Sequence, residues 1–373
     1  ALTSIFWREA WKYGLRAYRY CALDVGHALA GLALAARLQN WNSSLVHGKS
    51  TPPVGAILGL GQYQLPAAES EHFECLCYLG TDPDGSQSSF PNGFVEQISQ
   101  GSFEGTPNRL SQSHEHWKAI DRTARLVDAS TAGRSPQTVQ VWPGNPTPSA
   151  GQATTVIRQR RSAMAYDPHQ SMPRRAFMAI IRRTLPRIDQ PPYAGGVIEP
   201  AVHLFIFVHR VADLTPGLYA LCRHPDHHSQ LQSACSRSFL WERVEADLPL
   251  YRLKPGDFVY ESIEISCDQT IAGYSAFSLG MLAHFHPLLK AAPGAYRQLF
   301  WEAGQVGHIL YLEAEAHGYR GTGIGCFLDD GMHNLLGVKN RDFQSLYHFT
   351  VGSPVIDTRL KTLPPYHHLE RAN

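Results

Sequence analysis

The sequence predicts a globular protein in which helices and strands are mixed and which is organised in two units. Of its 373 residues, 43 % are hydrophobic and 17 % are charged, which provides ample apolar material for a core. Segments with helical periodicity alternate with short apolar runs that favour strands. Residues 130–153 have the composition of a linker and separate a first unit from a second.

The first unit is predicted to begin with helix. Residues 6–38 have helical periodicity in two segments, and we expect a break near Asp24 and Gly26. Two short buried strands follow, with a short helix between them that begins with prolines. After a loop at 80–107 we expect an amphipathic helix. The strands are assigned to NSSLVHG (42–48) and ECLCYLG (74–80), the short helix to TPPVGAILGLG (51–61), and the amphipathic helix to 108–129.

The second unit is predicted to contain a β-hairpin among helices. A helix over 172–185 precedes the strand VHLFIFVHR (202–210), whose bulky apolar residues favour β-structure, and TPGLYALCR (215–223) reads as the returning strand. Four further expectations are irregular or strand structure at 248–268, a long helical region at 275–317, a short helix at 330–338 and a closing strand at 345–354.

An internal repeat relates the two units. Displaced by 278 positions, KYGLRAYRYCALDVGHALAGLALAA (12–36) aligns with KAAPGAYRQLFWEAGQVGHILYLEA (290–314) at eight identical residues, whereas average composition gives about two. Two amphipathic helices that share only an apolar period are the alternative, and the aligned Lys and Ala-Tyr-Arg argue against it. We therefore expect a partial unit at 1–97, a connecting helix and linker at 98–153, and a complete unit at 154–373.

Composition argues against nucleic-acid and membrane partners. Lys and Arg number 33 against 32 Asp and Glu, so no global field attracts a polyanion, and any anion site must be local. The apolar segment 22–38 contains Asp24, His27 and Arg37 and is too short and too charged to span a bilayer. The chain begins with Ala1 rather than Met, so we expect it to begin within a longer product.

Cysteine and histidine usage predicts neither a disulfide framework nor a metal site. The seven cysteines are scattered, their number is odd, and no Cys-x-x-Cys pair occurs, which favours reduced thiols and a cytoplasmic protein. Three histidines gather in RHPDHH, at His224, His227 and His228. We interpret this segment as a polar turn between strands, with a metal site as the alternative.

Positive charge is concentrated in TVIRQRRSAMAYD (155–167), which holds three arginines within four positions. Guanidinium groups bind phosphate oxygens in a bidentate manner and keep their charge at any working pH. This segment is therefore a candidate phosphate site, and a solvated basic turn is the alternative.

Five motifs follow one another in a characteristic order: Arg-Arg-Ser (160–162), Ala-Gly-Gly (194–196), Glu-Ala-Gly (302–304), GTGIGCFLDD (321–330) and DTRLKTLPPY (357–366). This order resembles the nitroreductase-like FMN flavoproteins, and most closely their SagB/ThcOx branch, the azoline dehydrogenases. The resemblance covers about 150–365 in full and 1–90 as a partial, divergent copy. It implies an α+β fold, with a mainly antiparallel sheet wrapped by helices, in tandem here, and FMN at a dimer interface.

The resemblance implies four groups of cofactor-binding residues. Arg160, Arg161 and Ser162 would hold the flavin phosphate and ribityl chain, while Arg158 is expected in solvent. Met164 stands where the family often has a second basic residue. The remaining groups are Ala194, Gly195 and Gly196, whose backbone often serves the partner's flavin; Gly323, Ile324 and Gly325, near one isoalloxazine face; and Arg359, a terminal phosphate ligand. Ordinary turns and a solvated tail arginine are the alternatives for the last three.

The implied activity is hydride transfer to or from flavin N5, on a small-molecule or peptide-derived substrate. NAD(P)H is the usual reductant of nitroreductases. The azoline dehydrogenase branch carries a Lys-Tyr pair as base, and the partial copy has Lys12 and Tyr13 while the complete copy has Lys290 and Ala291. Lys290 is a candidate base, and Lys12 and Tyr13 are candidates if the units pack as a pseudo-dimer.

Two questions stay open at this point. We expect a homodimer, with an intramolecular pseudo-dimer of the two units as the alternative. A flavin-binding protein without turnover, or a scaffold in a peptide-modifying complex, remains the alternative to an enzyme.

Overall fold

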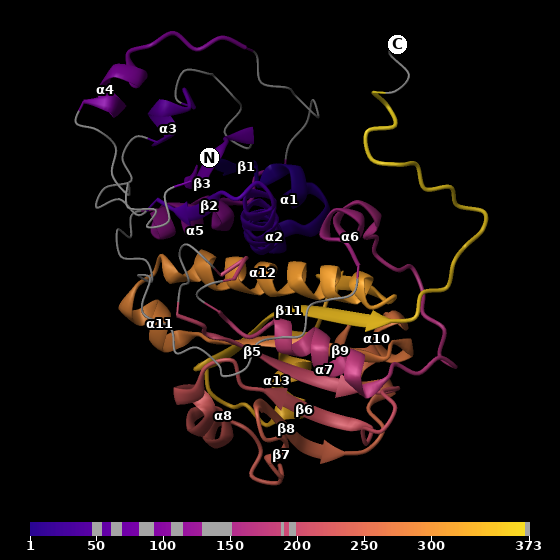
Figure 1. Ribbon diagram of the computed structural model, residues 1–373. Coiled ribbons are helices and arrows are strands. Elements are labelled where there is room, and N and C mark those ends of the chain that lie inside the picture. The colour runs from indigo at the N-terminus through magenta and orange to yellow at the C-terminus, as the bar shows by residue number, and fades with distance from the viewer. Residues whose placement is uncertain are drawn as a thin grey trace. The chain divides into compact units, whose positions relative to one another are not determined.

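A computed structural model describes residues 1–46, 54–60, 69–81, 93–105, 115–128, 151–187, 190–193 and 199–369. The chain packs as two compact units (Figure 1). Unit 1 comprises Ala1–Val141, Pro186–Pro200 and Phe285–Gln305, and unit 2 comprises Trp142–Leu185, Ala201–His284 and Val306–Asn373. This division by packing differs from the predicted repeat boundaries because two segments of the second half, 186–200 and 285–305, pack in unit 1.

Unit 2 is built on a seven-stranded sheet with the order β10-β11-β9-β5-β6-β8-β7, in which every neighbouring pair is antiparallel (Figure 1). Its two central strands are buried along almost their whole length, because helices cover both faces of the sheet. The strands are β5 (Val202–Val208), β6 (Gly217–Leu221), β7 (Glu242–Glu245), β8 (Leu248–Pro255), β9 (Phe277–His284), β10 (Arg320–Ile324) and β11 (Phe343–Gly352).

Side chains alternate between the two faces of this sheet. On one face, Phe205 and Leu282 belong to a core cluster that includes Leu231, Ile265 and Met332 from three helices. On the other face, the rings of Phe177 and Phe277 pack edge to face at 5.0 Å. The helical segments of unit 2 are α6 (Ala153–Gln159), α7 (Arg174–Arg183), η3 (Pro225–His227), α8 (His228–Ala234), α9 (Val259–Ile265), α10 (Ile271–Tyr274) and α13 (Asp329–Leu336).

Most predicted elements of unit 2 are confirmed. The hairpin β5–β6 pairs from Leu204↔Leu221 to Val208↔Gly217, and α7, β8, α13 and β11 lie where the sequence places them. Two predictions are wrong. Residues 277–284 form the central strand β9 rather than helix, because a short apolar run buried on both faces carries no diagnostic period. Residues 259–265 form helix α9, whose first amide, Val259 N–H, donates to Asp257 Oδ1.

Unit 1 consists mainly of helices with two small antiparallel sheets, β1–β3 and β2–β4. The predicted strands at 42–48 and 74–80 are confirmed in part, and the predicted helix at 108–129 is seen over Lys118–Asp128, its start lying outside the described residues. The elements are β1 (Leu2–Ser4), α1 (Trp7–Tyr13), η1 (Gly14–Arg16), α2 (Ala17–Leu38), β2 (Asn42–Leu45), α3 (Val54–Ile57), β3 (His72–Cys75), β4 (Cys77–Gly80), α4 (Phe94–Ser99), α5 (Lys118–Asp128) and α11 (His286–Ala291), and α12 (Ala295–Ala316) belongs to unit 1 as far as Gln305.

The break predicted near Asp24 lies ten residues earlier. Gly14 ends α1 with a φ of +54°, a conformation that favours glycine, and α2 then runs through Gly26 without interruption. Together these helical turns span Trp7–Leu38, 32 residues, which by length and composition suffices to cross a membrane. The expectation that this region is too short is therefore corrected. Half of its most apolar window is buried within the structure, as in the core helix of a globular unit.

Helix α2 and the first half of α12 cross at two glycines. A Cβ on Gly26 would lie 2.2 Å from the carbonyl oxygen of Trp301, and a Cβ on Gly304 would lie 2.2 Å from that of Leu23. These contacts are reciprocal, because Leu23 and Gly26 are the residues that the 278-position displacement aligns with Trp301 and Gly304. The aligned pair Tyr18 and Tyr296 also meets, with ring centroids 5.8 Å apart.

Candidate functional site

The arginine-rich segment lies at the end of a short helix in unit 2. Helix α6 stops at Gln159, and Arg160 leaves it with φ −48° and ψ 128°. Beside this end lies a cavity of about 550 Å³. The cavity is lined by Thr154, Thr155, Arg158, Gln159, Arg161, Glu315, Arg320, Thr362, Leu363, Pro364 and Pro365.

Three arginines and one carboxylate give this cavity an excess of positive charge. Among the described residues, Arg158, Arg161 and Arg320 make no ion pair; Arg161 Nη1 donates instead to the carbonyl oxygens of Arg158 and Arg160, at 3.3 and 2.8 Å. Glu315 Oε2 is buried and has no hydrogen-bond partner within the described part of the chain. The cavity therefore offers donors for an anion and one acceptor for a hydroxyl group.

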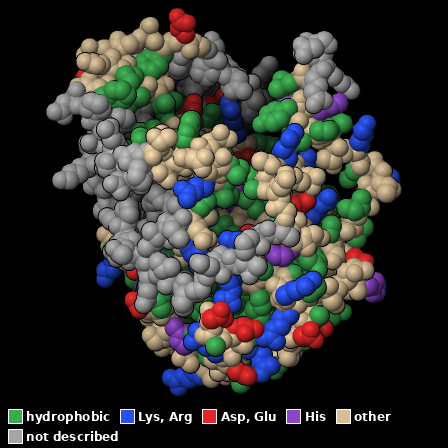
Figure 2. Space-filling model, viewed as in Figure 1, with side chains coloured by type: hydrophobic (Ala, Val, Ile, Leu, Met, Phe, Trp, Pro, Cys, Tyr) green, Lys and Arg blue, Asp and Glu red, His purple; other side chains and the backbone are tan. Residues whose placement is uncertain are grey.

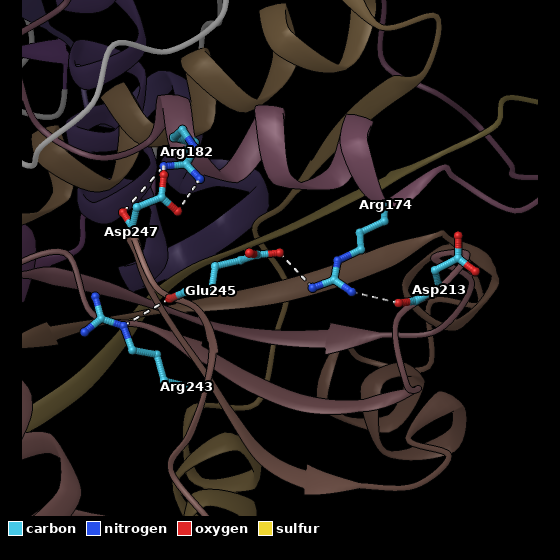
Figure 3. A network of polar contacts seen from close by, with 6 residues as sticks. All are labelled: Arg174, Arg182, Asp213, Arg243, Glu245 and Asp247. Atoms are coloured by element: carbon cyan, nitrogen blue, oxygen red, sulfur yellow. Dashed lines mark hydrogen bonds and ion pairs between the residues drawn. The ribbon is translucent and has the colours of Figure 1, made fainter.

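Other arginines of unit 2 are neutralised by carboxylates. Figure 2 shows basic and acidic side chains next to one another near the foot of the face that it presents. Figure 3 shows two such pairs: Arg182 binds both carboxylate oxygens of Asp247, at 2.9 and 3.1 Å, and Arg174 binds Glu245 at 2.7 Å. These pairs connect α7 to strand β7 and to the turn between β7 and β8. Unlike these two pairs, the arginines of the cavity have no carboxylate partner among the described residues.

Arg160 points to a different neighbour from Arg161. Its guanidinium carbon lies 5.0 Å from the centroid of the Tyr311 ring, a cation–π contact. Burial lowers the pKa of His308 to about 4, and the positive charge of Arg160 adds to the effect. His308 is therefore neutral at physiological pH.

The hydroxyl of Tyr311 connects the arginine segment to strand β10. It accepts a hydrogen bond from Gly323 N–H at 2.9 Å and lies 3.1 Å from Ser162 Oγ. Thr322 adds a second connection, because its Oγ1 accepts from Ala163 N–H at 3.0 Å and lies 2.9 Å from Ala163 O. Two motifs about 160 positions apart in the sequence thus form one cluster.

The residues of the glycine motif have distinct roles. A Cβ on Gly323 would lie 1.9 Å from the hydroxyl oxygen of Tyr347, so the position requires glycine because of side-chain packing. Ile324 is 2 % exposed and belongs to the core. Gly325 follows the end of β10 and is partly exposed.

The predicted arginine at the C-terminal end has a local partner. Arg359 is 87 % exposed in its side chain, and it forms a bidentate ion pair with Asp357 at 2.9 and 2.8 Å. The segment that lines the cavity begins three residues later, at Thr362.

The candidate base residues lie in unit 1, and all of them are exposed. Lys290 is in the last turn of α11. Lys12 Nζ lies 5.0 Å from the centroid of the Tyr13 ring, and Tyr13 packs edge to face on Tyr20 at 4.7 Å. Ala194, Gly195 and Gly196 lie outside the described residues.

Four residues of this cluster were missed by sequence reasoning. Arg158 is exposed, as expected, but its place in the lining of the cavity with Arg161, three positions further along the chain, was not foreseen. Arg320 directly precedes GTGIG, and its place at the start of that motif is the signal that could have identified it. Tyr311 and Thr322 carried no such signal, because only the fold brings them to Ser162 and Ala163.

No cluster of three or more His, Cys, Asp or Glu side chains that could hold a metal occurs among the described residues. The segment RHPDHH forms η3 and the start of α8 rather than a turn alone. Within it, His227 Nδ1 lies 3.1 Å from Nε2 of the buried His203. Burial, followed by the neighbouring His227, holds the pKa of His203 well below its usual range.

Comparisons with known proteins identify the fold. No protein-family model and no curated protein matches this chain. Among solved structures, a putative nitroreductase from Anabaena variabilis matches with a TM-score of 0.63 and 19 % identity, over 95 % of this chain and 68 % of that chain.

Two further solved structures are less similar. A putative nitroreductase from Ralstonia eutropha has a TM-score of 0.39 at 14 % identity, over 61 % of this chain and 96 % of its own. A chain of the Escherichia coli microcin synthetase McbBCD complex, with truncated pro-MccB17 bound, has a TM-score of 0.40 at 13 % identity, over 74 % and 87 %. The similarity to the Anabaena protein and the antiparallel sheet of unit 2 show that this chain has an α+β, nitroreductase-like fold.

Proposed function

We propose that this protein is an FMN-dependent oxidoreductase that transfers hydride to or from a small-molecule or peptide-derived substrate. The observation that carries the proposal is the cavity of unit 2 that Arg158, Arg161 and Arg320 line. The nitroreductase-like fold and the resemblance of the motifs to SagB/ThcOx-type dehydrogenases support the same conclusion.

The residues of the cavity fit the phosphate end of FMN. Three guanidinium groups without carboxylate partners among the described residues suit a phosphate dianion, which they bind more strongly than neutral donors do. The buried Glu315 Oε2 suits a hydroxyl donor, such as those of a ribityl chain. A volume of about 550 Å³ lies within the range of small-molecule sites, about 300–1,000 Å³.

FMN, when bound, supplies hydride transfer at its N5 atom, and NAD(P)H is the proposed reductant. The side chains of the chain position the cofactor and handle protons. Tyr311 holds Ser162 and the Gly323 amide in one arrangement, so the arginine segment and β10 keep a fixed relation. Lys290, or Lys12 with Tyr13, remains our proposed source of a base.

We also propose that the two copies pair within one chain. The reciprocal contacts of Gly26 with Trp301 and Gly304 with Leu23 have the pattern of an isologous two-fold interface, in which each residue meets its counterpart's neighbour. In a homodimer, the same pairs would form between a helix of one chain and its copy in the other chain. Here both helices belong to one chain, so the observation favours the intramolecular pseudo-dimer over the homodimer.

A flavin-binding or scaffold protein without turnover is the second candidate function. Two observations favour it. Lys290 is followed by Ala291 rather than by tyrosine, and Met164, at a position that is often basic in the family, is 82 % exposed. Such a protein would serve as a partner in a peptide-modifying complex.

A visible absorption spectrum of the purified protein tests the first proposal, with the heat-released chromophore compared against FMN and FAD by chromatography. We expect a flavin spectrum, release of FMN, and bleaching on anaerobic addition of NAD(P)H. FMN without bleaching by NAD(P)H or any substrate would favour the second candidate. A colourless protein that takes up no added FMN would contradict both flavin proposals.

A further inference from the structure

Two cysteines of unit 2 that are far apart in the sequence meet at the surface. Cys267 Sγ and Cys326 Sγ lie 2.6 Å apart, across 59 positions of the chain. A disulfide bond is about 2.05 Å long, so bond formation needs only a small approach of the two sulfur atoms. Cys326 is exposed and Cys267 is partly exposed, whereas Cys222 and Cys235 of the same unit are buried.

Hydrogen bonds hold the backbones of the two cysteines together. Gln269 Nε2 donates to Cys326 O at 3.1 Å and to Ser266 O at 2.8 Å. Leu328 N–H donates to Ile265 O at 2.8 Å. The turn after α9 and the segment after β10 are thus joined on both sides of the sulfur pair.

The turn that carries Cys267 has an unusual backbone. Cys267 and Asp268 have φ of +55° and +58°, a left-handed conformation that residues with a Cβ rarely adopt. Their amides are held by Glu264 O at 3.1 Å and Ile263 O at 3.0 Å. Such conformations persist only where the surrounding structure enforces them, and here the enforced turn places Cys267 Sγ against Cys326 Sγ.

We propose that Cys267 and Cys326 form a dithiol–disulfide exchange site that reacts with low-molecular-weight disulfides of the glutathione type. The exposed Cys326, as thiolate, attacks one sulfur of glutathione disulfide, forms a mixed disulfide and releases one glutathione thiolate. Cys267, as thiolate, then attacks the Cys326 sulfur and releases the second glutathione. The protein loses two protons and two electrons, and one glutathione disulfide becomes two glutathione molecules.

The exchange site is independent of the proposed flavin activity. Its product would tie the turn after α9 to the segment that directly follows Gly323–Gly325. Because neither cysteine lines the cavity or belongs to the proposed flavin site, the test below holds whether or not the protein binds FMN.

The test treats the full-length protein with glutathione disulfide, alkylates the remaining thiols, and maps the peptides by mass spectrometry. We expect a Cys267–Cys326 linked peptide pair that lacks two hydrogen atoms and that dithiothreitol separates. Cys267→Ser should instead retain glutathione on Cys326, because the resolving thiol is absent. Cys326→Ser should show neither the link nor this adduct.

Two outcomes would overturn the proposal. One is a glutathione adduct that persists on Cys326 in the unmodified protein. The other is a glutathione adduct on the buried Cys222 or Cys235 before Cys326 is modified, since that order would indicate unfolding rather than a surface site. Circular dichroism of both serine variants verifies that they are folded.

Discussion

Arginine residues of unit 2 serve two purposes, which their partners distinguish. Arg182 and Arg174 hold carboxylates of the turn between β7 and β8 and of β7, and they are structural (Figure 3). Arg158, Arg161 and Arg320 line a cavity and have no ion-pair partner among the described residues. Three unpaired guanidinium groups repel one another, so their grouping is more consistent with an anion site than with a stabilising contact.

Neutral substitution of the cavity arginines should weaken binding of FMN. A hydrogen bond to a charged group contributes about 1.5–3 kcal/mol, so Arg161→Gln or Arg320→Gln should each raise the Kd by about 10- to 100-fold. Flavin fluorescence titration measures the effect. Arg182→Gln is the matched control, because it removes an equal charge from a residue paired with Asp247 and should leave the Kd unchanged. Equal effects of all three substitutions would contradict the assignment.

Gly323 should tolerate no larger residue while Tyr347 is present. The Cβ of Gly323→Ala would lie 1.9 Å from the Tyr347 hydroxyl oxygen, and Tyr347 is only 7 % exposed, so the ring has little room to move. We expect a loss of about 1–3 kcal/mol in the free energy of unfolding, measured with urea. In a Tyr347→Phe background the loss should be smaller, because the nearest atom is gone. If Gly323→Ala costs the same free energy of unfolding in both backgrounds, the clash does not involve the Tyr347 hydroxyl.

At the scale of the element, the crossing of α2 with α12 depends on two glycines. Neither has a φ that excludes other residues, so the requirement comes from the close approach of two backbones. A backbone carbonyl cannot move aside as a side chain can. The same reasoning explains why Gly26 does not interrupt α2, although the sequence alone suggested a break there.

Gly26→Ala and Gly304→Ala should therefore destabilise the protein to a similar degree. Each should reduce the free energy of unfolding by about 2 kcal/mol or more, and the double variant by less than the sum, because both act on one contact. Gly55→Ala is the control, since no atom of the described residues lies within 4 Å of its added Cβ. If the crossing lies within one chain, the unfolding midpoint should not depend on protein concentration, and a clear dependence would favour the homodimer.

At the scale of the whole molecule, the two units contain buried groups with opposite responses to pH. Burial raises the pKa of Glu74 in unit 1 to about 7, against the lesser influence of Arg297 and Ser4. Burial, assisted by Arg210, lowers the pKa of His209 in unit 2 to about 4. Burial disfavours the charged form in both cases, and the acid and the base therefore shift in opposite directions.

Acidification from pH 7 to 4.5 should stabilise unit 1 locally and destabilise unit 2. Between about pH 4.5 and 7, Glu74 is protonated in the folded protein and ionised in the unfolded chain. Its contribution to the free energy of unfolding therefore grows as pH falls and is lost as pH rises through about 7. Below pH 6.5, His209 is protonated in the unfolded chain but stays neutral in the folded protein. The free energy of unfolding of unit 2 therefore decreases, by at most about 3 kcal/mol, as pH falls toward about 4.

Hydrogen exchange, corrected for its intrinsic pH dependence, separates the two effects. Amides of α2 and β3 should gain protection at pH 4.5, and amides of β5 and β9 should lose it. Glu74→Gln should reduce the first trend, because burial also raises the pKa of Asp24 in α2, to about 6, and His209→Gln should reduce the second. A parallel change in both units would contradict this account.

Elements and motifs with local signals could be predicted from the sequence. The hairpin β5–β6, helix α7 and strand β11 follow from periodicity and bulky apolar residues, and the order of the motifs indicated the nitroreductase-like fold. The residues that the 278-position displacement aligns are also those that touch at the crossing of α2 and α12.

Features that depend on long-range contacts could not be predicted and are seen only in the folded chain. Strand β9 reads as helix in sequence, since burial on both faces removes its period, and α9 had no clear signal. The cavity combines α6, the start of β10 and a segment near residue 363, and Tyr311 joins motifs that no local pattern relates. The cysteine pair is separated by 59 positions and meets only because two turns are held together by backbone hydrogen bonds.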